Sequence, residues 1–282
     1  MVENNRWGNL FAHIVLILGV AIVVFPVYVA VIASTHPSGT FLRGVMPLLP
    51  GPNAIENYRT VIFEGRSRAG TPPIGGMLWN SFIMAMAITI GKLSISLLSA
   101  FAIVYFRFPF RIFFFWVIFL TLMLPVEVRI VPTFEVVANL GMLNSFAGLS
   151  IPLIASATAT FLFRQFFMTV PEELMEAARV DGAGPMKFFK DILLPLSITN
   201  IAALFVIMFI YGWNQYLWPL LITTDPEYYT IVMGIQRMVT GGDSEPLWHL
   251  VMATVVLAAL PPILVILLMQ RLFVKGLTET EK

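Results

Sequence analysis

Long apolar runs separated by short polar segments dominate the sequence. A helix needs about 20 apolar residues to cross the hydrocarbon core of a bilayer. Six windows reach or approach that length: residues 10–33, 78–106, 112–126, 143–163, 198–222 and 247–273. The third window is short, and the polar residues Glu127, Arg129 and Glu135 beyond it favour a helix that leaves the bilayer. The pattern predicts an all-α integral membrane protein with six transmembrane helices in a single domain over residues 1–282.

Composition supports this class and excludes several others. The chain is 58% hydrophobic and 12% charged, whereas soluble domains are about 45–50% apolar and about 25% charged. The mean hydropathy is +0.86. A net charge of +1 gives no basic surface for nucleic acid. The chain has no cysteine, which excludes disulfides, iron–sulfur clusters and thiol catalysis. His13, His36 and His249 lack metal-ligand spacing, so we expect no metal site.

The basic residues predict the orientation of the six helices. The first apolar window is longer than the 7–15 residues of a signal peptide and lacks a clear cleavage site after it, so we expect it to stay. Cytoplasmic loops carry an excess of Lys and Arg. A cytoplasmic N-terminus places these basic residues inside: Arg6, Arg107, Arg111, Arg164, Arg179, Lys187, Lys190, Arg271, Lys275 and Lys282. The short outer loops then hold only Arg129 and Arg237. We therefore predict that both termini and residues 168–197 are cytoplasmic.

Residues 168–197 form a charged segment that predicts two short helices. Pro171 suits the start of the first helix, and Glu172 and Glu173 complement the positive end of its dipole. Gly182 suits a stop that needs a left-handed backbone. One face is expected to share Leu174, Ala177, Ala178 and Asp181.

The second helix of this segment is expected to open at Pro185 and to end at Pro195. Its apolar stripe contains Phe189, Ile192 and Leu193. Two adjacent alanines in the first helix leave little side chain on one face, which suits docking into a groove of another protein. The alternative is a solvated hairpin that connects two transmembrane helices.

The same segment carries a motif with fixed spacing. It reads E-A-A, three residues, G, nine residues and then I-x-L-P, with Glu176, Ala177, Ala178, Gly182, Ile192, Leu194 and Pro195 at the matched positions. This resembles the EAA loop of ABC importer permeases. Other stretches, including "YGWNQYLWPL" and "SAFAIVYFRFPFR", resemble the maltose/carbohydrate-type permease family. The phrases "MLPVEVRI" and "ASATATFLFRQFFMT" are most similar to permeases for sn-glycerol-3-phosphate. Family members often have Gly where this chain has Phe110.

The resemblance implies an ABC type I importer permease fold in the bacterial inner membrane. It implies a heterodimer with a second permease, two copies of a cytoplasmic ATPase and an extracytoplasmic binding protein. ATP and Mg²⁺ would be bound by the ATPase, so this chain is expected to hold no cofactor and no catalytic residue. Residues expected to couple to the ATPase are Glu176, Ala177, Ala178, Asp181, Gly182, Ile192, Leu194 and Pro195.

The sequence agrees that the ATPase lies elsewhere, because no phosphate-binding loop of the form G-x-x-x-x-G-K-[ST] occurs. The only Gly-Lys pair is Gly91-Lys92, and Met86 occupies the place of the first glycine.

Two features are candidate substrate contacts. Lys92 lies inside the second window, where a lysine costs about 2.5–3.5 kcal/mol on insertion scales. It can attract a phosphate, pair with a carbonyl group or extend toward an interface. Transport sites lie beside irregular helix near the midplane, and the fifth window holds a polar and aromatic run before Pro219: Trp213, Asn214, Gln215, Tyr216 and, two residues on, Trp218. The alternative for this run is an interfacial aromatic belt with hydrogen bonds between helices.

Three function classes compete at this point. The leading hypothesis is a permease subunit that imports sn-glycerol-3-phosphate or its diesters through alternating access. A permease for a neutral sugar or oligosaccharide is the alternative, because nothing in the spacing distinguishes these substrates. An ion-coupled secondary transporter predicts buried carboxylates, and an intramembrane enzyme predicts a nucleophile–base or metal constellation. The sequence supports neither of the last two classes.

Overall fold

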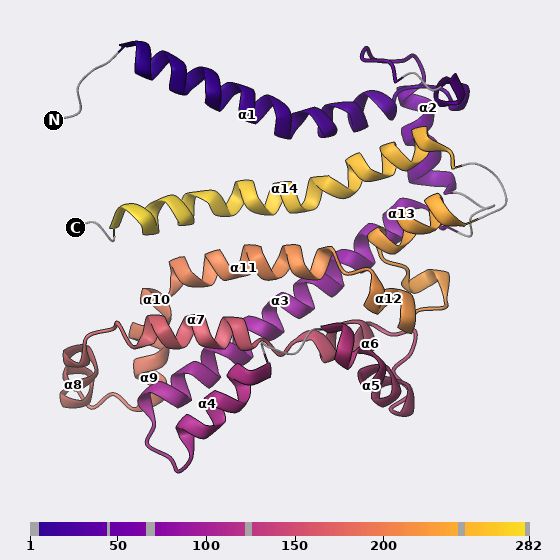
Figure 1. Cartoon of the computed structure of the whole chain (residues 1–282). Helices are drawn as coiled ribbons and strands as arrows, with labels where there is room; N and C mark the ends of the chain where they lie inside the picture. The colour runs from indigo at the N-terminus through magenta and orange to yellow at the C-terminus, as the bar shows by residue number, and fades with distance from the viewer. Residues whose placement is uncertain (1–5, 44–45, 66–70, 122–125, 242–245, 280–282) are drawn as a thin grey trace. The chain divides into compact units, whose positions relative to one another are not determined.

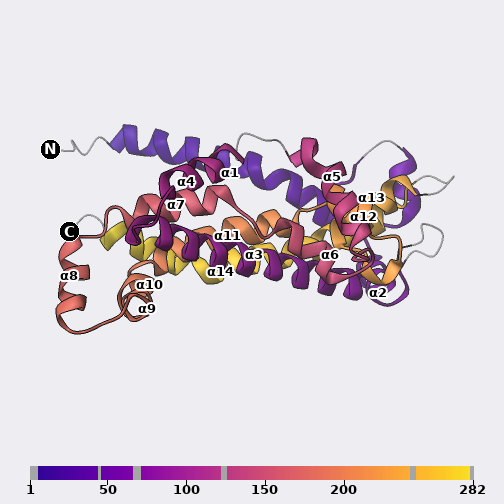
Figure 2. The ribbon, with the colours of Figure 1, turned by 90° about the horizontal axis from the view of Figure 1, so that it is seen from below.

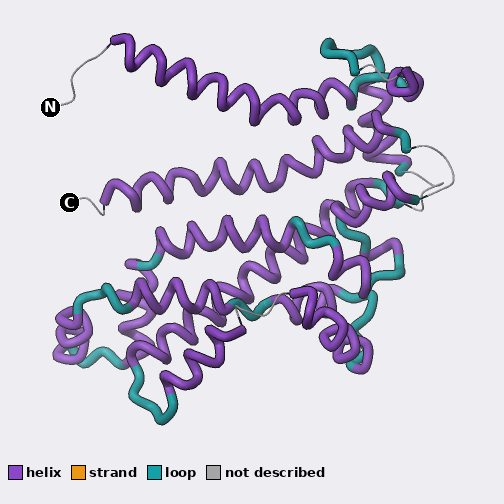
Figure 3. The backbone as a smooth tube through the Cα atoms, viewed as in Figure 1, coloured by secondary structure: helices purple, strands orange, loops and turns teal. Residues whose placement is uncertain are grey.

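The computed structural model describes residues 6–43, 46–65, 71–121, 126–241 and 246–279. Those residues form helices and loops, with no strand among them (Figure 3). The chain divides into two compact units. One contains Met1–Gly76 and Gly234–Leu260, and the other contains Met77–Met233 and Pro261–Lys282. The predicted all-α class is confirmed.

The first unit contains α1 (Arg6–Ala33), η1 (Ser38–Arg43), α2 (Ala54–Arg59) with its π-helical extension η2 (Thr60–Glu64), most of α13 (Ile231–Thr240) and the first part of α14 (Trp248–Glu279). The Asn57 amide holds α2 to the end of α1, because its Nδ2 donates to the carbonyl groups of Ser34 and His36 at 2.8 and 2.9 Å. Most apolar side chains of α1 are exposed within the chain, as expected for a helix that meets lipid or a partner subunit.

The second unit holds the longest helix and the segment with the motif. Its elements are α3 (Ile74–Tyr105), α4 (Arg111–Leu120), α5 (Val126–Asn139), α6 (Phe146–Ser150), η5 (Ile151–Leu153), α7 (Ala157–Phe167), α8 (Glu172–Val180), α9 (Pro185–Phe188), η6 (Phe189–Leu193), α10 (Leu194–Leu196), α11 (Ile198–Trp213), α12 (Leu217–Ile222), η7 (Pro226–Tyr228) and the end of α14 (Figure 1). Helices α3 and α11 approach closely, since a Cβ added at Gly212 would lie 2.9 Å from the Cα of Ala85. Small residues permit such contacts between membrane helices.

Three described helices are long and apolar enough to cross a membrane, namely α1, α3 and α14, or up to five spans if each of two bent pairs forms one. The window over residues 143–163 is not one continuous helix. Residues Phe146–Leu153 and Ala157–Phe167 meet at 47°, because Ser156 caps a new helix there by accepting from Ala159 N. The window over residues 198–222 also contains two helices, since α11 ends at Trp213 and α12 begins at Leu217.

The third window contains the ten-residue helix α4. Of the polar residues beyond it, Arg129 and Glu135 lie on α5 and are exposed. Residues 122–125, between the two, lie outside the described residues, as does the Glu127 side chain. Helix α13, a ten-residue apolar helix, was not predicted from the hydropathy pattern.

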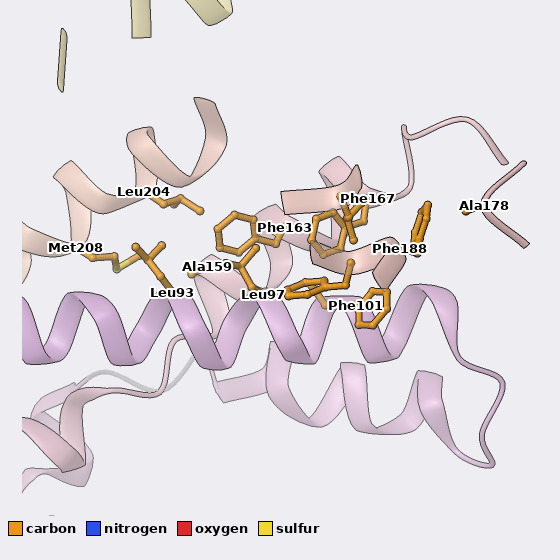
Figure 4. Close-up of a cluster of buried hydrophobic side chains, with 13 residues drawn as sticks. Leu93, Leu97, Phe101, Ala159, Phe163, Phe167, Ala178, Phe188, Leu204 and Met208 are labelled. Carbon is orange, nitrogen blue, oxygen red and sulfur yellow. The ribbon is translucent and has the colours of Figure 1, made fainter. Parts of the chain in front are cut away.

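An apolar cluster fills the end of the second unit that carries α8 and α9 (Figure 4). We call it the end cluster. It joins α3, α7, α8, the α9–η6 stretch and α11 through Leu93, Leu97, Ala100, Phe101, Ala159, Phe163, Phe167, Ala178, Phe188, Phe189, Leu193, Leu204 and Met208. Phe101 lies 4.8 Å from Phe189 between ring centroids, and Tyr105 lies 5.3 Å from Phe188. The cluster therefore fixes the base of the charged segment on three longer helices.

Candidate functional site

The charged segment begins as predicted. Helix α8 starts at Glu172 directly after Pro171, with Glu172 and Glu173 in its first turn. Both carboxylates are exposed and lie near the positive end of the helix dipole, where negative charge is stabilising. In two perpendicular views α8 stands at one end of the second unit, next to α9 and α10 (Figures 1 and 2).

The turn after α8 is set by Gly182. Its φ is +73°, a left-handed conformation that costs an L-residue about 1–2 kcal/mol. Gly182 N donates to Arg179 O at 3.1 Å, and Ala183 N donates to Ala178 O at 2.8 Å. This pair of bonds is the Schellman motif, which satisfies carbonyl groups at a helix end. The predicted left-handed stop is confirmed, and no atom lies within 4 Å of where a Cβ would stand.

The two motif alanines point in different directions. Ala178 is only 6% exposed and packs in the end cluster beside Phe188, whereas Ala177 is exposed (Figure 4). The expectation that both lie on one open face is therefore wrong. Consecutive helical residues are 100° apart, and the face that turns inward contains Met175 and Ala178.

The second part of the segment follows its prediction to within one residue. Pro185 opens α9 as predicted, and Phe189 and Leu193 are buried, together with Phe188, which was not predicted. The helix ends at Leu196, one residue after Pro195, and the chain then bends by 73° into α11. The π-helical turn over η6 precedes the proline. Such a turn accommodates the altered hydrogen bonding that a proline imposes.

The eight residues expected to couple to an ATPase thus separate into two groups. An outer group is exposed: Glu176, Ala177, Asp181, Gly182 and Pro195. An inner group packs in or against the end cluster: Ala178, Ile192 and Leu194. The arrangement is a short helix and a turn with an open outer face and a fixed inner face.

Lys92 lies on α3 and is 6% exposed. Its Nζ stands 3.6 Å from the ring centroid of Tyr211 on α11, which is a cation–π contact. No ion pair to Lys92 occurs among the residues that the structure describes. Arg129 on α5 is near enough for its positive charge to act on Lys92. An aromatic ring orients an ammonium group without forming an ion pair with it.

The aromatic run of the fifth window is distributed between core and junction. Trp213 is buried and stacks on Phe209 at 5.8 Å, and Trp218 is buried with Nε1 donating to Gly148 O at 3.1 Å. Asn214, Gln215 and Tyr216 form the junction between α11 and α12, where Asn214 is exposed and the other two are half-buried.

Tyr211 links two of the predicted pathway residues and was missed by the sequence analysis. Its ring lies under Lys92, and its carbonyl group accepts a hydrogen bond from Gln215 Nε2 at 3.1 Å. The spacing of four residues between Tyr211 and Gln215 was the available signal, since such residues face each other on a helix. Lys92 and Gln215 thus both contact Tyr211, whereas Trp213 lies in the core.

A family of known proteins matches about two thirds of the chain. Residues 92–279 match the family described as "Binding-protein-dependent transport system inner membrane component". The chain belongs to this family. It is a membrane permease subunit of a binding-protein-dependent transporter.

Curated relatives extend over the whole chain. The chain is 60% identical to the sn-glycerol-3-phosphate transport system permease protein UgpE of Brucella melitensis, 58% identical to that of Salmonella typhi and 57% identical to that of Agrobacterium fabrum, with full coverage of both chains in each case. The fold has a solved counterpart in a bacterial ABC transporter involved in the import of the acidic polysaccharide alginate, with a TM-score of 0.76, 20% identity and coverage of 96% of this chain and 98% of that one. The predicted ABC importer permease fold is confirmed.

Proposed function

We propose that this chain is one of two permease subunits of an ATP-driven importer for sn-glycerol-3-phosphate or its diesters. Relatives with 57–60% identity over the whole length carry the name of that transport system. The partners are a second permease, two copies of a cytoplasmic ATPase and an extracytoplasmic binding protein. The ATPase binds ATP and Mg²⁺, and this chain holds no cofactor. The transporter lies in the bacterial inner membrane with both termini of this chain in the cytoplasm.

The division of the charged segment into an outer and an inner group carries the coupling proposal. The outer group (Glu176, Ala177, Asp181, Gly182 and Pro195) docks on the ATPase, and the inner group transmits its displacement to the end cluster. ATP can shift the permease between inward- and outward-facing states only if it favours one of them. If α8 moved freely relative to the end cluster, ATP binding at the ATPase could not change the relative free energies of the two permease states. Ala178 and Phe188 supply the contact that prevents such motion.

Lys92 is the proposed phosphate contact in the pathway. It is buried in the second unit, lies against the ring of Tyr211 and is within the electrostatic reach of Arg129. A phosphate monoester carries about −1.5 to −2 charge at neutral pH, so two cations near one point favour it over a neutral sugar. Gln215 and the exposed Asn214 at the α11–α12 junction offer hydrogen bonds to hydroxyl groups, and Tyr216 lines the same junction.

The complete complex, reconstituted in lipid with its binding protein, tests class and substrate together. ATPase activity is compared with sn-glycerol-3-phosphate and with maltose. Stimulation by sn-glycerol-3-phosphate alone is the expected result. Stimulation by maltose alone would keep the transporter class and overturn the substrate. Uptake that persisted without ATP and followed an ion gradient would contradict the ATP-driven mechanism.

Variants of Lys92 test the phosphate contact within the same complex. Lys92→Met is expected to lower kcat/KM for uptake by at least about tenfold, since a hydrogen bond to a charged group contributes about 1.5–3 kcal/mol. Lys92→Arg keeps the charge and is expected to retain most uptake. Unchanged transport in both variants would overturn the role of Lys92.

A further inference from the structure

A hollow of about 430 Å³, counted with its open mouth, lies between α3, α4 and the end of α7 in the second unit. Apolar side chains of all three elements line it, among them Ile103, Ile112, Phe115 and Met168. Two arginines, Arg111 and Arg164, complete the lining. The hollow is separate from the Lys92 site and from the outer face of α8.

Arg164 is half-buried and is held in an unusual way for a cation. Its guanidinium carbon lies 4.2 Å above the ring centroid of Phe115. Its Nε is buried and makes no hydrogen bond among the described residues. The structure records no ion pair for it within that part of the chain. Buried polar groups are normally hydrogen-bonded, so this nitrogen indicates a partner that the chain does not supply.

Arg111 leaves most of its donors available too. Its only recorded side-chain bond within the described residues is from Nη1 to the Phe106 carbonyl, at 3.4 Å. An arginine has five N–H donors in a planar fork that matches phosphate oxygens. Two such groups on one small hollow, with no carboxylate in the lining, are complementary to an anion with several oxygens.

The surroundings of the hollow are those of a membrane surface. Helix α4 exposes Phe113, Trp116 and Val117 along its outer side, as a lipid-facing helix does. Phe110, immediately before Arg111, is 75% exposed with a φ of +62°, a conformation that favours glycine. A chain that keeps a large exposed aromatic side chain in such a conformation is consistent with insertion of that side chain into the lipid interface.

We propose that this hollow binds the headgroup of an anionic phospholipid from the leaflet on the side of α8. Arg111 and Arg164 hold the phosphate, and Phe115, Ile112 and Met168 contact the glycerol and the first methylene groups. Basic pockets between membrane helices on the cytoplasmic side recognise such headgroups. Bound lipid would join α4 to α7, and α7 leads directly into the charged segment at α8. The lipid thus stabilises the helix from which the docking segment extends.

The test uses the assembled transporter, delipidated and titrated with phosphatidylglycerol while bound lipid is counted by native mass spectrometry. Arg164→Gln is expected to weaken binding by more than about tenfold, since a hydrogen bond to a charged group contributes that much or more. The matched control is Arg107→Gln, an exposed arginine at the same end that does not line the hollow. It is expected to weaken binding by at most about fivefold, the effect of one surface charge.

Two further arms keep the result decisive. Arg111→Gln alters an arginine at the mouth of the hollow and serves if Arg164→Gln does not assemble; it is expected to weaken binding more than Arg107→Gln does. Phosphatidylcholine, inorganic phosphate and sn-glycerol-3-phosphate are titrated alongside. Equal binding of phosphatidylglycerol by all variants, or displacement of the lipid by either soluble anion at millimolar concentration, would overturn the lipid assignment.

Discussion

The charged segment around α8 and the junction between α11 and α12 contrast in how sequence becomes geometry. At α8 the helix starts after Pro171 and turns at Gly182, as local backbone rules dictate. At the junction, the polar and aromatic residues proposed as substrate contacts do not share one environment. Trp213 is buried, whereas Asn214 is exposed. The ends of a short exposed helix are determined by its own start and stop residues. The position of a break inside a helix bundle is determined by the side chains that pack around it.

The contrast also separates two mechanical roles. The α8 segment presents an open outer face on a packed base, which suits transmission of force. The junction interrupts a helix beside Lys92 and Tyr211, where polar side chains can meet a substrate. One region is therefore expected to be sensitive in coupling and the other in substrate recognition.

The largest expected effect is a loss of stability on truncation of a side chain in the end cluster. Phe163→Ala removes a fully buried ring of the end cluster and is expected to lower the free energy of unfolding by about 3–5 kcal/mol. Thermal unfolding of the purified complex measures it. Phe113→Ala, at an exposed position on α4, is the control and should leave the melting temperature nearly unchanged. Equal shifts would contradict the packed base.

Next in size is the turn. Gly182→Asp forces a left-handed backbone on a residue that disfavours it by about 1–2 kcal/mol and adds charge to the outer face. We expect normal membrane levels with uptake reduced by at least about tenfold, equivalent to 1.4 kcal/mol or more. Gly184→Asp is the matched control, since Gly184 has a φ of −71° and is equally open. Normal uptake by Gly182→Asp would refute the role of the turn.

The neighbouring alanines sharpen the comparison within one helix. Ala178→Leu overfills the end cluster and is expected to destabilise the complex by about 1–3 kcal/mol. Ala177→Leu should leave the melting temperature intact and reduce substrate-stimulated ATPase activity, because its side chain projects outward. The melting temperature and the substrate-stimulated ATPase activity are measured for both variants. Identical profiles would mean that the two alanines do not differ in role.

The smallest effect concerns the junction. Trp218→Phe removes the hydrogen bond from Nε1 to Gly148 O, and we expect a loss of about 0.5–1.5 kcal/mol in stability with uptake unchanged. Trp79→Phe, at an exposed tryptophan on α3, is the control for thermal unfolding. A strong loss of uptake in Trp218→Phe would place this residue in the pathway instead of the core.

Hydropathy alone predicted α1, α3 and α14, because an uninterrupted apolar run of about 20 residues has one stable form in a bilayer. The breaks could not be predicted in the same way. Pro26 and Pro262 lie inside α1 and α14 without ending them, while Pro152 lies in the 3-10 turn η5, before the bend into α7. Whether a proline breaks a membrane helix depends on the neighbours that satisfy the freed backbone groups.

Within the candidate site, the spacing of the motif predicted the turn at Gly182 but not the inward direction of Ala178. That direction depends on Phe188 and on the end cluster, whose members come from six elements of the chain. Lys92 stood out because a charge in an apolar window is costly. Its partner Tyr211 did not, since only the packing of α3 against α11 brings the two together.

One labelling experiment tests the central claim, that α8 docks with its Ala177 side outward. The chain has no cysteine, so Ala177→Cys and Ala178→Cys each introduce a single thiol for maleimide labelling in membranes with and without the ATPase. We predict that Ala177→Cys reacts readily alone and is protected when the ATPase is bound, while Ala178→Cys reacts slowly in both states. Equal reactivity of Ala177→Cys with and without the ATPase would contradict the account.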